Sequence, residues 1–251
     1  WSSDVCSSDL TLLIINLEKI YTMDMVNKHP LVFQHAFIAI HHERILAVGC
    51  GSWREYADKD TRILDGRGHI AVPGFIEVEA QLSTASERDG LRRQLEEGMA
   101  YMRNGTLTLA CRGGGAAALR EQPCFEILDA NPACIPVMYP YASLFQKNKK
   151  RLCRFCISAA GNYAIQDQLC AAQLMGMAEV YDAWTLLQAL TVWPARALDR
   201  GELGHIQRNA QADILLFAHT DIHALFHTLG NRYLAQVIKK GIRFFPDILV
   251  S

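Results

Sequence analysis

Residues 64–82 read LDGRGHIAVPGFIEVEAQL. The stretch begins as the end of a short strand, passes through a turn that contains two glycines, and continues as an apolar strand from Pro73-Gly74-Phe75-Ile76. Glu77 and Glu79 then alternate with apolar residues. Two interpretations stay open: both are polar residues that face solvent or an arginine, or Glu79 is a hard oxygen donor that binds a metal weakly.

This stretch resembles the start of the barrel in the amidohydrolase superfamily, whose pattern there is D-x-x-G-x-x-[VL]-x-P-G-[FL]-[IV]-D-x-H-x-H. The positions that agree are Asp65, Gly68, Pro73, Gly74, Phe75 and Ile76. Glu79 and Gln81 occupy the positions of the two metal-binding histidines. The sequence therefore keeps the family scaffold at this point and lacks its H-x-H pair.

A second partial motif lies near the C-terminus. Gly204-His205-Ile206 and Gln211-Ala212-Asp213 are similar to the family ending G-x-I-x-x-G-x-x-A-D-[LI], with Asn209 where glycine is usual. Among amidohydrolases, the chain most resembles the imidazolonepropionases. The features that carry this resemblance are the L-L-I-x-N start at residues 12–16, the PVMYPYASLF stretch at 136–145, and the ending at 237–241.

The resemblance implies an α/β protein with two parts. Short strands in residues 11–71 and 202–251 are expected to form a small β-sheet module built from both termini, around an incomplete TIM-barrel-like βα domain at 72–201. A closed eightfold barrel needs about 200 residues or more. The interval 72–201 holds 130 residues, which is room for roughly four βα units of about 30 residues each. A central block of the barrel is therefore expected to be absent, which leaves open strand edges that favour self-association.

Within these parts the apolar spacing predicts helices over 87–104, 165–177, 183–190 and 191–198. Strands are predicted over 105–109, 134–139 and 154–159, and residues 125–130 are predicted to end a helix. Residues 1–10, WSSDVCSSDL, resemble a translated sequencing-library adapter and are interpreted as a non-native leader.

Composition excludes several classes of protein. The 251 residues carry a net charge of −1, which gives no electrostatic signature for nucleic acid. No apolar run approaches the roughly 18 residues of a membrane span. The eight cysteines form no compact framework, so we interpret them as reduced thiols of a cytoplasmic protein.

The resemblance implies water activated on zinc or iron, held by the H-x-H pair, later histidines and an aspartate at the end of the last strand. No histidine lies between Ile70 and Gly204. Ala159 or Ala160 falls at the aspartate position. No metal cofactor is therefore expected, with Glu79 and Gln81 in the histidine positions.

Other motifs allow more than one interpretation. Arg112 and Gly114, in a run of three glycines, are candidate residues for binding a small-molecule ligand, or form a flexible turn. Cys153 and Cys156 form a C-x-x-C that we interpret as buried structural thiols. The basic run at 147–151 is interpreted as a solvated loop. His219, His223 and His227 share one helical face, a spacing suited to a transition metal, although His219 is predicted to precede a helix capped by Asp221.

Three functions follow. The first is an imidazolonepropionase-like amidohydrolase, which hydrolyses a cyclic amide C–N bond in histidine degradation, impaired because its metal ligands are absent. The second is a non-catalytic protein on the same scaffold that binds a partner or a second copy of itself. The third is a working hydrolase with a different ligand set that includes Glu79.

Overall fold

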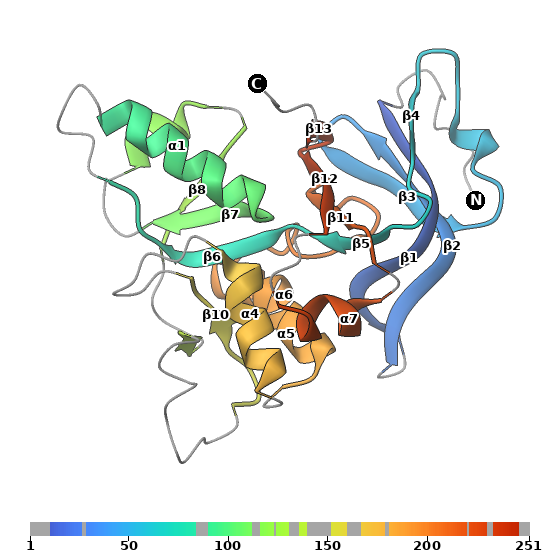
Figure 1. Cartoon of the computed structure of the whole chain (residues 1–251). Coiled ribbons are helices and arrows are strands. Elements are labelled where there is room, and N and C mark those ends of the chain that lie inside the picture. The colour runs from blue at the N-terminus through green and yellow to red at the C-terminus, as the bar shows by residue number, and fades with distance from the viewer. Residues whose placement is uncertain are drawn as a thin grey trace. The chain divides into compact units, whose positions relative to one another are not determined.

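The computed structural model describes residues 11–26, 29–83, 90–111, 116–122, 124–130, 136–139, 152–159, 167–178, 181–219, 221–229 and 233–245. The chain divides into two compact units, each assembled from segments far apart in sequence (Figure 1). The sheet unit comprises Trp1–Pro73, His205–Thr220 and Ala235–Ser251, and the barrel unit comprises Gly74–Gly204 and Asp221–Leu234. In the described part of the chain, no helix is long and apolar enough to cross a lipid bilayer.

Strands from both ends of the chain form the sheet unit. Within the described residues the order is β13-β12-β11-β5-β1-β2-β3, with β4 paired to β1. The strands are β1 (Leu12–Val26), β2 (His29–His41), β3 (Arg44–Cys50), β4 (Arg62–Asp65), β5 (Ile70–Pro73), β11 (Ile214–Phe217), β12 (Leu234–Lys239) and β13 (Ile242–Phe245). A short 3-10 helix, η2 (Arg54–Tyr56), follows β3. Because β5 pairs with both β1 and β11, it joins the N-terminal and C-terminal strands into one sheet, as predicted.

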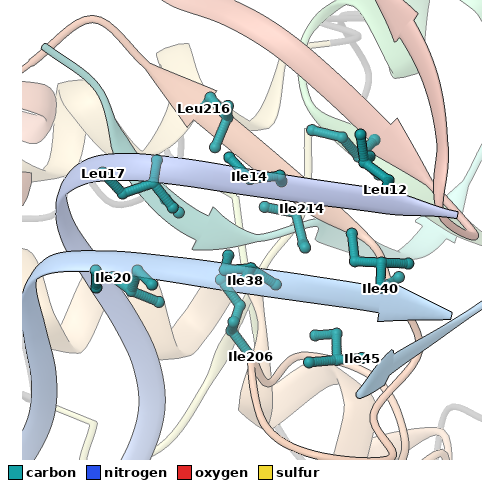
Figure 2. Packing of buried hydrophobic residues seen from close by; sticks show 14 of the residues in the cluster. Leu12, Ile14, Leu17, Ile20, Ile38, Ile40, Ile45, Ile206, Ile214 and Leu216 are labelled. Atoms are coloured by element: carbon teal, nitrogen blue, oxygen red, sulfur yellow. The ribbon is translucent and has the colours of Figure 1, made fainter. Parts of the chain in front are cut away.

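A β-branched core holds this sheet together. Ile14 of β1, Ile38 of β2 and Ile214 of β11 are completely buried and pack in one cluster (Figure 2). Ile206 and Leu216 extend the cluster. Isoleucine suits a pleated, buried surface, and burying each such side chain contributes about 1.5–3 kcal/mol.

Parallel strands in two groups form the barrel unit. The first group has the order β6-β7-β8 and the second pairs β9 with β10. They are β6 (Phe75–Ala80), β7 (Thr106–Cys111), β8 (Glu126–Asp129), β9 (Val137–Met138) and β10 (Cys156–Ile157). Helix α1 (Gly90–Arg103) connects β6 to the parallel strand β7, which makes a βαβ unit. The described residues therefore form an incomplete barrel, as predicted.

Short helices complete the barrel unit. They are α2 (Ala117–Arg120), α4 (Gln168–Met177), α5 (Ala183–Leu190), α6 (Val192–Ala197) and α7 (Ile222–His227). Helix α7 begins after Asp221, whose Oδ1 accepts a hydrogen bond from the Ala224 amide at 2.9 Å, as predicted. Residues 202–251 were expected to supply strands of the sheet module. Within that range α7 packs on α4, where Gln173 Nε2 donates to the Leu225 carbonyl at 2.9 Å.

The prediction of a helix end at residues 125–130 is wrong, because β8 is a strand parallel to β7. Ile127 packs in the cluster of Tyr101 and Leu109, whereas Leu128 packs with Ile76. Neighbouring side chains that enter different clusters are typical of an extended strand. Tertiary pairing with β7 therefore overrides the short apolar pattern.

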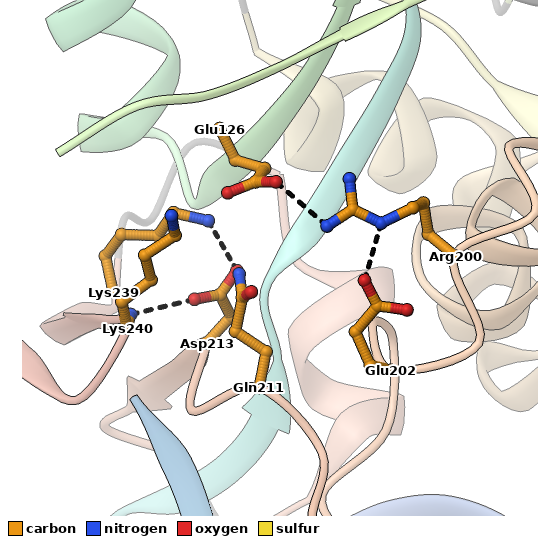
Figure 3. A network of polar contacts seen from close by, with 7 residues as sticks. All are labelled: Glu126, Arg200, Glu202, Gln211, Asp213, Lys239 and Lys240. Carbon is orange, nitrogen blue, oxygen red and sulfur yellow. Dashed lines mark hydrogen bonds and ion pairs between the residues drawn. The ribbon is translucent and has the colours of Figure 1, made fainter. Parts of the chain in front are cut away.

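An arginine beyond α6 forms an ion pair with β8. Arg200, three residues beyond α6, donates from Nη2 to Glu126 of β8 at 2.9 Å and from Nε to Glu202 at 2.5 Å (Figure 3). All three residues are half-buried, so the pairs are shielded from solvent more than exposed pairs are.

Candidate functional site

The strand β6 carries a carboxyl group that is completely buried, Glu77. Its Oε1 accepts from the Glu79 amide at 3.0 Å, and its Oε2 accepts from the Ala159 amide at 2.8 Å. The Ser158 side chain also hydrogen-bonds to this carboxyl group. The interpretation of Glu77 as a solvent-facing or arginine-paired residue is therefore wrong: it connects the end of β6 to the residues that follow β10.

Burial raises the pKa of Glu77 from 4.5 to about 7, because the charged form loses its hydration. The hydrogen bonds from Ser158 and the two amides act in the opposite direction, and the charge of Glu79 raises the pKa further. Such a pKa is the usual property of a general acid or base.

Glu79 and Gln81 lie where the sequence motif predicts them, at the end of β6 and just beyond it. Glu79 is half-buried, and its Oε2 accepts a hydrogen bond from the Tyr139 hydroxyl, just after β9. Gln81 is exposed. The two positions that carry histidines in the resembled family are therefore occupied by a tyrosine-bound carboxylate and a solvent-facing amide.

Gln168, the first residue of α4, forms hydrogen bonds to three strands of the barrel unit. Its Nε2 donates to the carbonyls of Ile76 in β6 and Ile157 in β10, at 3.1 and 2.8 Å. Its Oε1 accepts from the Thr106 hydroxyl of β7 at 2.9 Å. The side chain is fully buried and its amide group is satisfied on both sides. Sequence analysis missed Gln168 and Glu77; the acidic position of the D-x-H-x-H pattern, which Glu77 occupies, was the signal for the latter.

Two buried thiols belong to the same region. Burial raises the pKa of Cys111 to about 11 and that of Cys156 to about 12. Both stay protonated near neutral pH, and a metal requires the thiolate. Cys153, the other half of the C-x-x-C motif, is exposed and unbonded to Cys156. The interpretation of this pair as buried thiols therefore holds for Cys156 only.

The donor set at the strand ends does not fit the metal that the fold family implies. Ala159 is one of the two alanines, with Ala160, that fall at the aspartate position, and it offers a backbone amide, which is a donor and not a ligand. Glu77 accepts the hydrogen bond of that amide, and Glu79 accepts a hydrogen bond from the Tyr139 hydroxyl. Within the residues that the structure describes, no group of three or more histidines, cysteines or carboxylates is placed to hold a metal ion.

The structure describes only some of the other residues that the sequence singled out. Arg112 and Gly114, the candidate ligand-binding residues, lie outside the described residues, as does the basic run at 147–151. His223 and His227 lie on α7, while His219 precedes the helix and belongs to the sheet unit. The three histidines therefore do not form the single helical face that their spacing allowed.

A cavity of about 420 Å³ lies within the sheet unit. Strands β1, β2 and β3, the short helix η2 and residues 206–208 line it, through Thr22, Asp24, Leu31, Phe33, Leu46, Ala47, Val48, Tyr56, Ile206, Gln207 and Arg208. Asp24 at its edge pairs with His205 through Oδ1 and Nδ1 at 2.8 Å. The cavity is mixed in polarity and lies in a different unit from the buried carboxyl group.

No protein-family model and no curated protein matches the sequence. Solved structures do match the fold. The atrazine chlorohydrolase TrzN from Arthrobacter aurescens TC1, complexed with zinc, is 14% identical with a TM-score of 0.63, over 93% of this chain and 95% of that one. An adenosine deaminase from Xanthomonas campestris with bound zinc is 13% identical with a TM-score of 0.66, over 93% and 92%. A prolidase complexed with N-methylphosphonate-L-proline is 12% identical with a TM-score of 0.63, over 93% and 99%.

These structural neighbours are hydrolases of the amidohydrolase superfamily. At this level of identity the likeness establishes the fold alone: an α/β chain with a small β-sheet module and a TIM-barrel-like βα domain that is incomplete in the described residues.

Proposed function

We propose that this chain is an imidazolonepropionase-like member of the amidohydrolase superfamily in which the hydrolytic step is impaired. The single observation that carries the proposal is Glu77. In the resembled family a metal is held between the ends of the first and last barrel strands; here the Glu77 carboxyl group makes that connection, to the Ala159 amide at 2.8 Å. The Glu77 oxygens accept hydrogen bonds from two backbone amides and from the Ser158 side chain, which leaves about one of their four lone pairs for a metal.

The substrate class comes from the sequence resemblance. It implies a five-membered cyclic amide that carries a propionate, opened at a C–N bond in histidine degradation. Arg112 and Gly114 remain the proposed contacts for the anionic end of that ligand. Guanidinium groups and backbone amides are the donors that bind carboxylates.

Two measurements on the same preparation test both parts. Imidazolone propionate is added with and without Zn(II), and ring opening is followed; binding of imidazole propionate, which has no cyclic amide to hydrolyse, is measured by calorimetry. We expect binding, which Arg112→Ala weakens, and no ring opening above the uncatalysed rate. Turnover that Glu77→Gln abolishes would show instead that Glu77 is catalytic. Absence of binding would refute the proposed ligand class.

The open strand edges favour a second function, self-association. Among the described residues, β8 pairs only with β7, and β9 only with β10. Unpaired edges present backbone donors and acceptors to another chain. Sedimentation over a hundredfold range of concentration would show a concentration-dependent dimer if this function holds. A monomer throughout would exclude it.

A further inference from the structure

Helix α7 carries two histidines that the proposed function does not use. His223 and His227 stand four residues apart, so both project from one face of the helix. Their ring centroids are 4.1 Å apart and their planes differ by only 7°, so the exposed His223 ring has to rotate out of this stack before both rings can ligate one ion. His223 is exposed and His227 is half-buried, so ions in solvent reach the pair.

A hydrogen bond fixes the tautomer of His227. Its Nδ1 lies 2.9 Å from the backbone carbonyl oxygen of His223. Because a carbonyl oxygen only accepts, Nδ1 carries the proton in the neutral ring, and the lone pair lies on Nε2. Metal-binding histidines characteristically donate their other ring N–H to a carbonyl or carboxylate in this way, which orients the ring and raises its basicity.

We propose that His223 and His227 form a two-histidine site for a divalent transition metal that favours imidazole, with water in the remaining positions. Imidazole nitrogen suits Ni(II), Cu(II) and Zn(II), whereas Mg(II) and Ca(II) prefer oxygen. The inference is independent of the buried carboxyl group in the barrel, since it uses neither Glu77 nor Glu79.

Titration calorimetry with Ni(II) on the full chain tests the site. We expect a single Ni(II) ion to bind, and His223→Gln or His227→Gln to weaken that binding by at least the roughly 10–100-fold that loss of an outer-shell partner causes. His223 is exposed, so its replacement leaves the fold intact. Mg(II) is expected to show no heat of binding at this site.

The chain supplies a matched control. His41 and His42 are also neighbouring histidine rings, with centroids 4.4 Å apart, but they are tilted by 48° and adjacent in sequence. The His41→Gln/His42→Gln variant should bind Ni(II) as the parent does. The proposal is overturned if the parent binds no Ni(II). It is also overturned if the two α7 variants bind Ni(II) as tightly as the parent does while the His41→Gln/His42→Gln variant binds it more weakly.

Discussion

Glu77 is the residue on which the barrel site depends, and its raised pKa has a definite consequence for stability. The unfolded chain titrates near 4.5 and the folded chain near 7. Between these values the folded state binds more protons, so stability falls as pH rises through this window. A shift of this size corresponds to roughly 3 kcal/mol.

We therefore predict that Glu77→Gln flattens the dependence of unfolding free energy on pH between 4.5 and 7. The amide cannot ionise, although its NH₂ group faces one of the two backbone donors and lowers stability at acid pH by about 1 kcal/mol. Urea unfolding at closely spaced pH values measures the slope. An unchanged slope in the variant would assign the effect to another group.

In the sheet unit, Asp213 is the carboxylate whose partners we expect to determine stability. Its Oδ2 lies 2.6 Å from Lys239 Nζ, and it accepts from Gln211 and the Lys240 amide, both at 2.9 Å (Figure 3). Lys239 is completely buried, so removing its partner leaves an uncompensated charge in the interior. We predict that Asp213→Ala lowers the unfolding free energy by about 3–5 kcal/mol.

Two variants make that measurement specific. Arg92→Ala breaks an ion pair with Glu96 whose side chains are 82% and 64% exposed, and should change stability by less than about 1 kcal/mol. The double variant Asp213→Leu/Lys239→Met removes both charges and should be more stable than Asp213→Ala. Equal losses in the double and single variants would refute the ion-pair explanation.

At the scale of elements, the turn between β12 and β13 depends on a close backbone approach. Gly241 has φ of +76°, and a Cβ there would lie 1.9 Å from the carbonyl oxygen of His42. Its amide donates to the Ala212 carbonyl at 3.0 Å, so the turn cannot move away without losing that bond.

Gly241→Ala should therefore destabilise the sheet unit by more than the roughly 1 kcal/mol that positive φ alone costs an alanine. Gly68 provides the comparison, because its φ is +75° and a Cβ there meets nothing within 4 Å. Thermal unfolding of Gly241→Ala and Gly68→Ala separates the clash from the strain. Similar losses in both would show that the contact with His42 relaxes freely.

The elements show where sequence patterns succeed. The helix predicted at 183–190 matches α5, because an aspartate cap and an amphipathic repeat act locally. Strand β8 was predicted wrongly and β13 was not predicted, because four-residue strands owe their state to neighbours distant in sequence.

At the scale of the whole molecule, the sequence predicted the architecture better than the site. Motifs at both ends placed the terminal strands in one sheet, and the length of the interval 72–201 predicted an incomplete barrel. The positions of Glu79 and Gln81 were predictable because the motif spacing fixes one at the end of β6 and the other just beyond it. The role of Glu77 was not, since it arises from a contact with Ala159, 82 positions away along the chain.

The central claim is that a protein carboxyl group occupies the place of a metal between β6 and β10. The most direct test is the zinc and iron content of the purified His223→Ala/His227→Ala variant, which lacks the surface pair on α7, by inductively coupled plasma mass spectrometry. The account predicts neither metal above the background of the buffer. Near-stoichiometric zinc or iron that Glu77→Gln or Glu79→Gln removes would contradict it, and would identify those carboxylates as metal ligands.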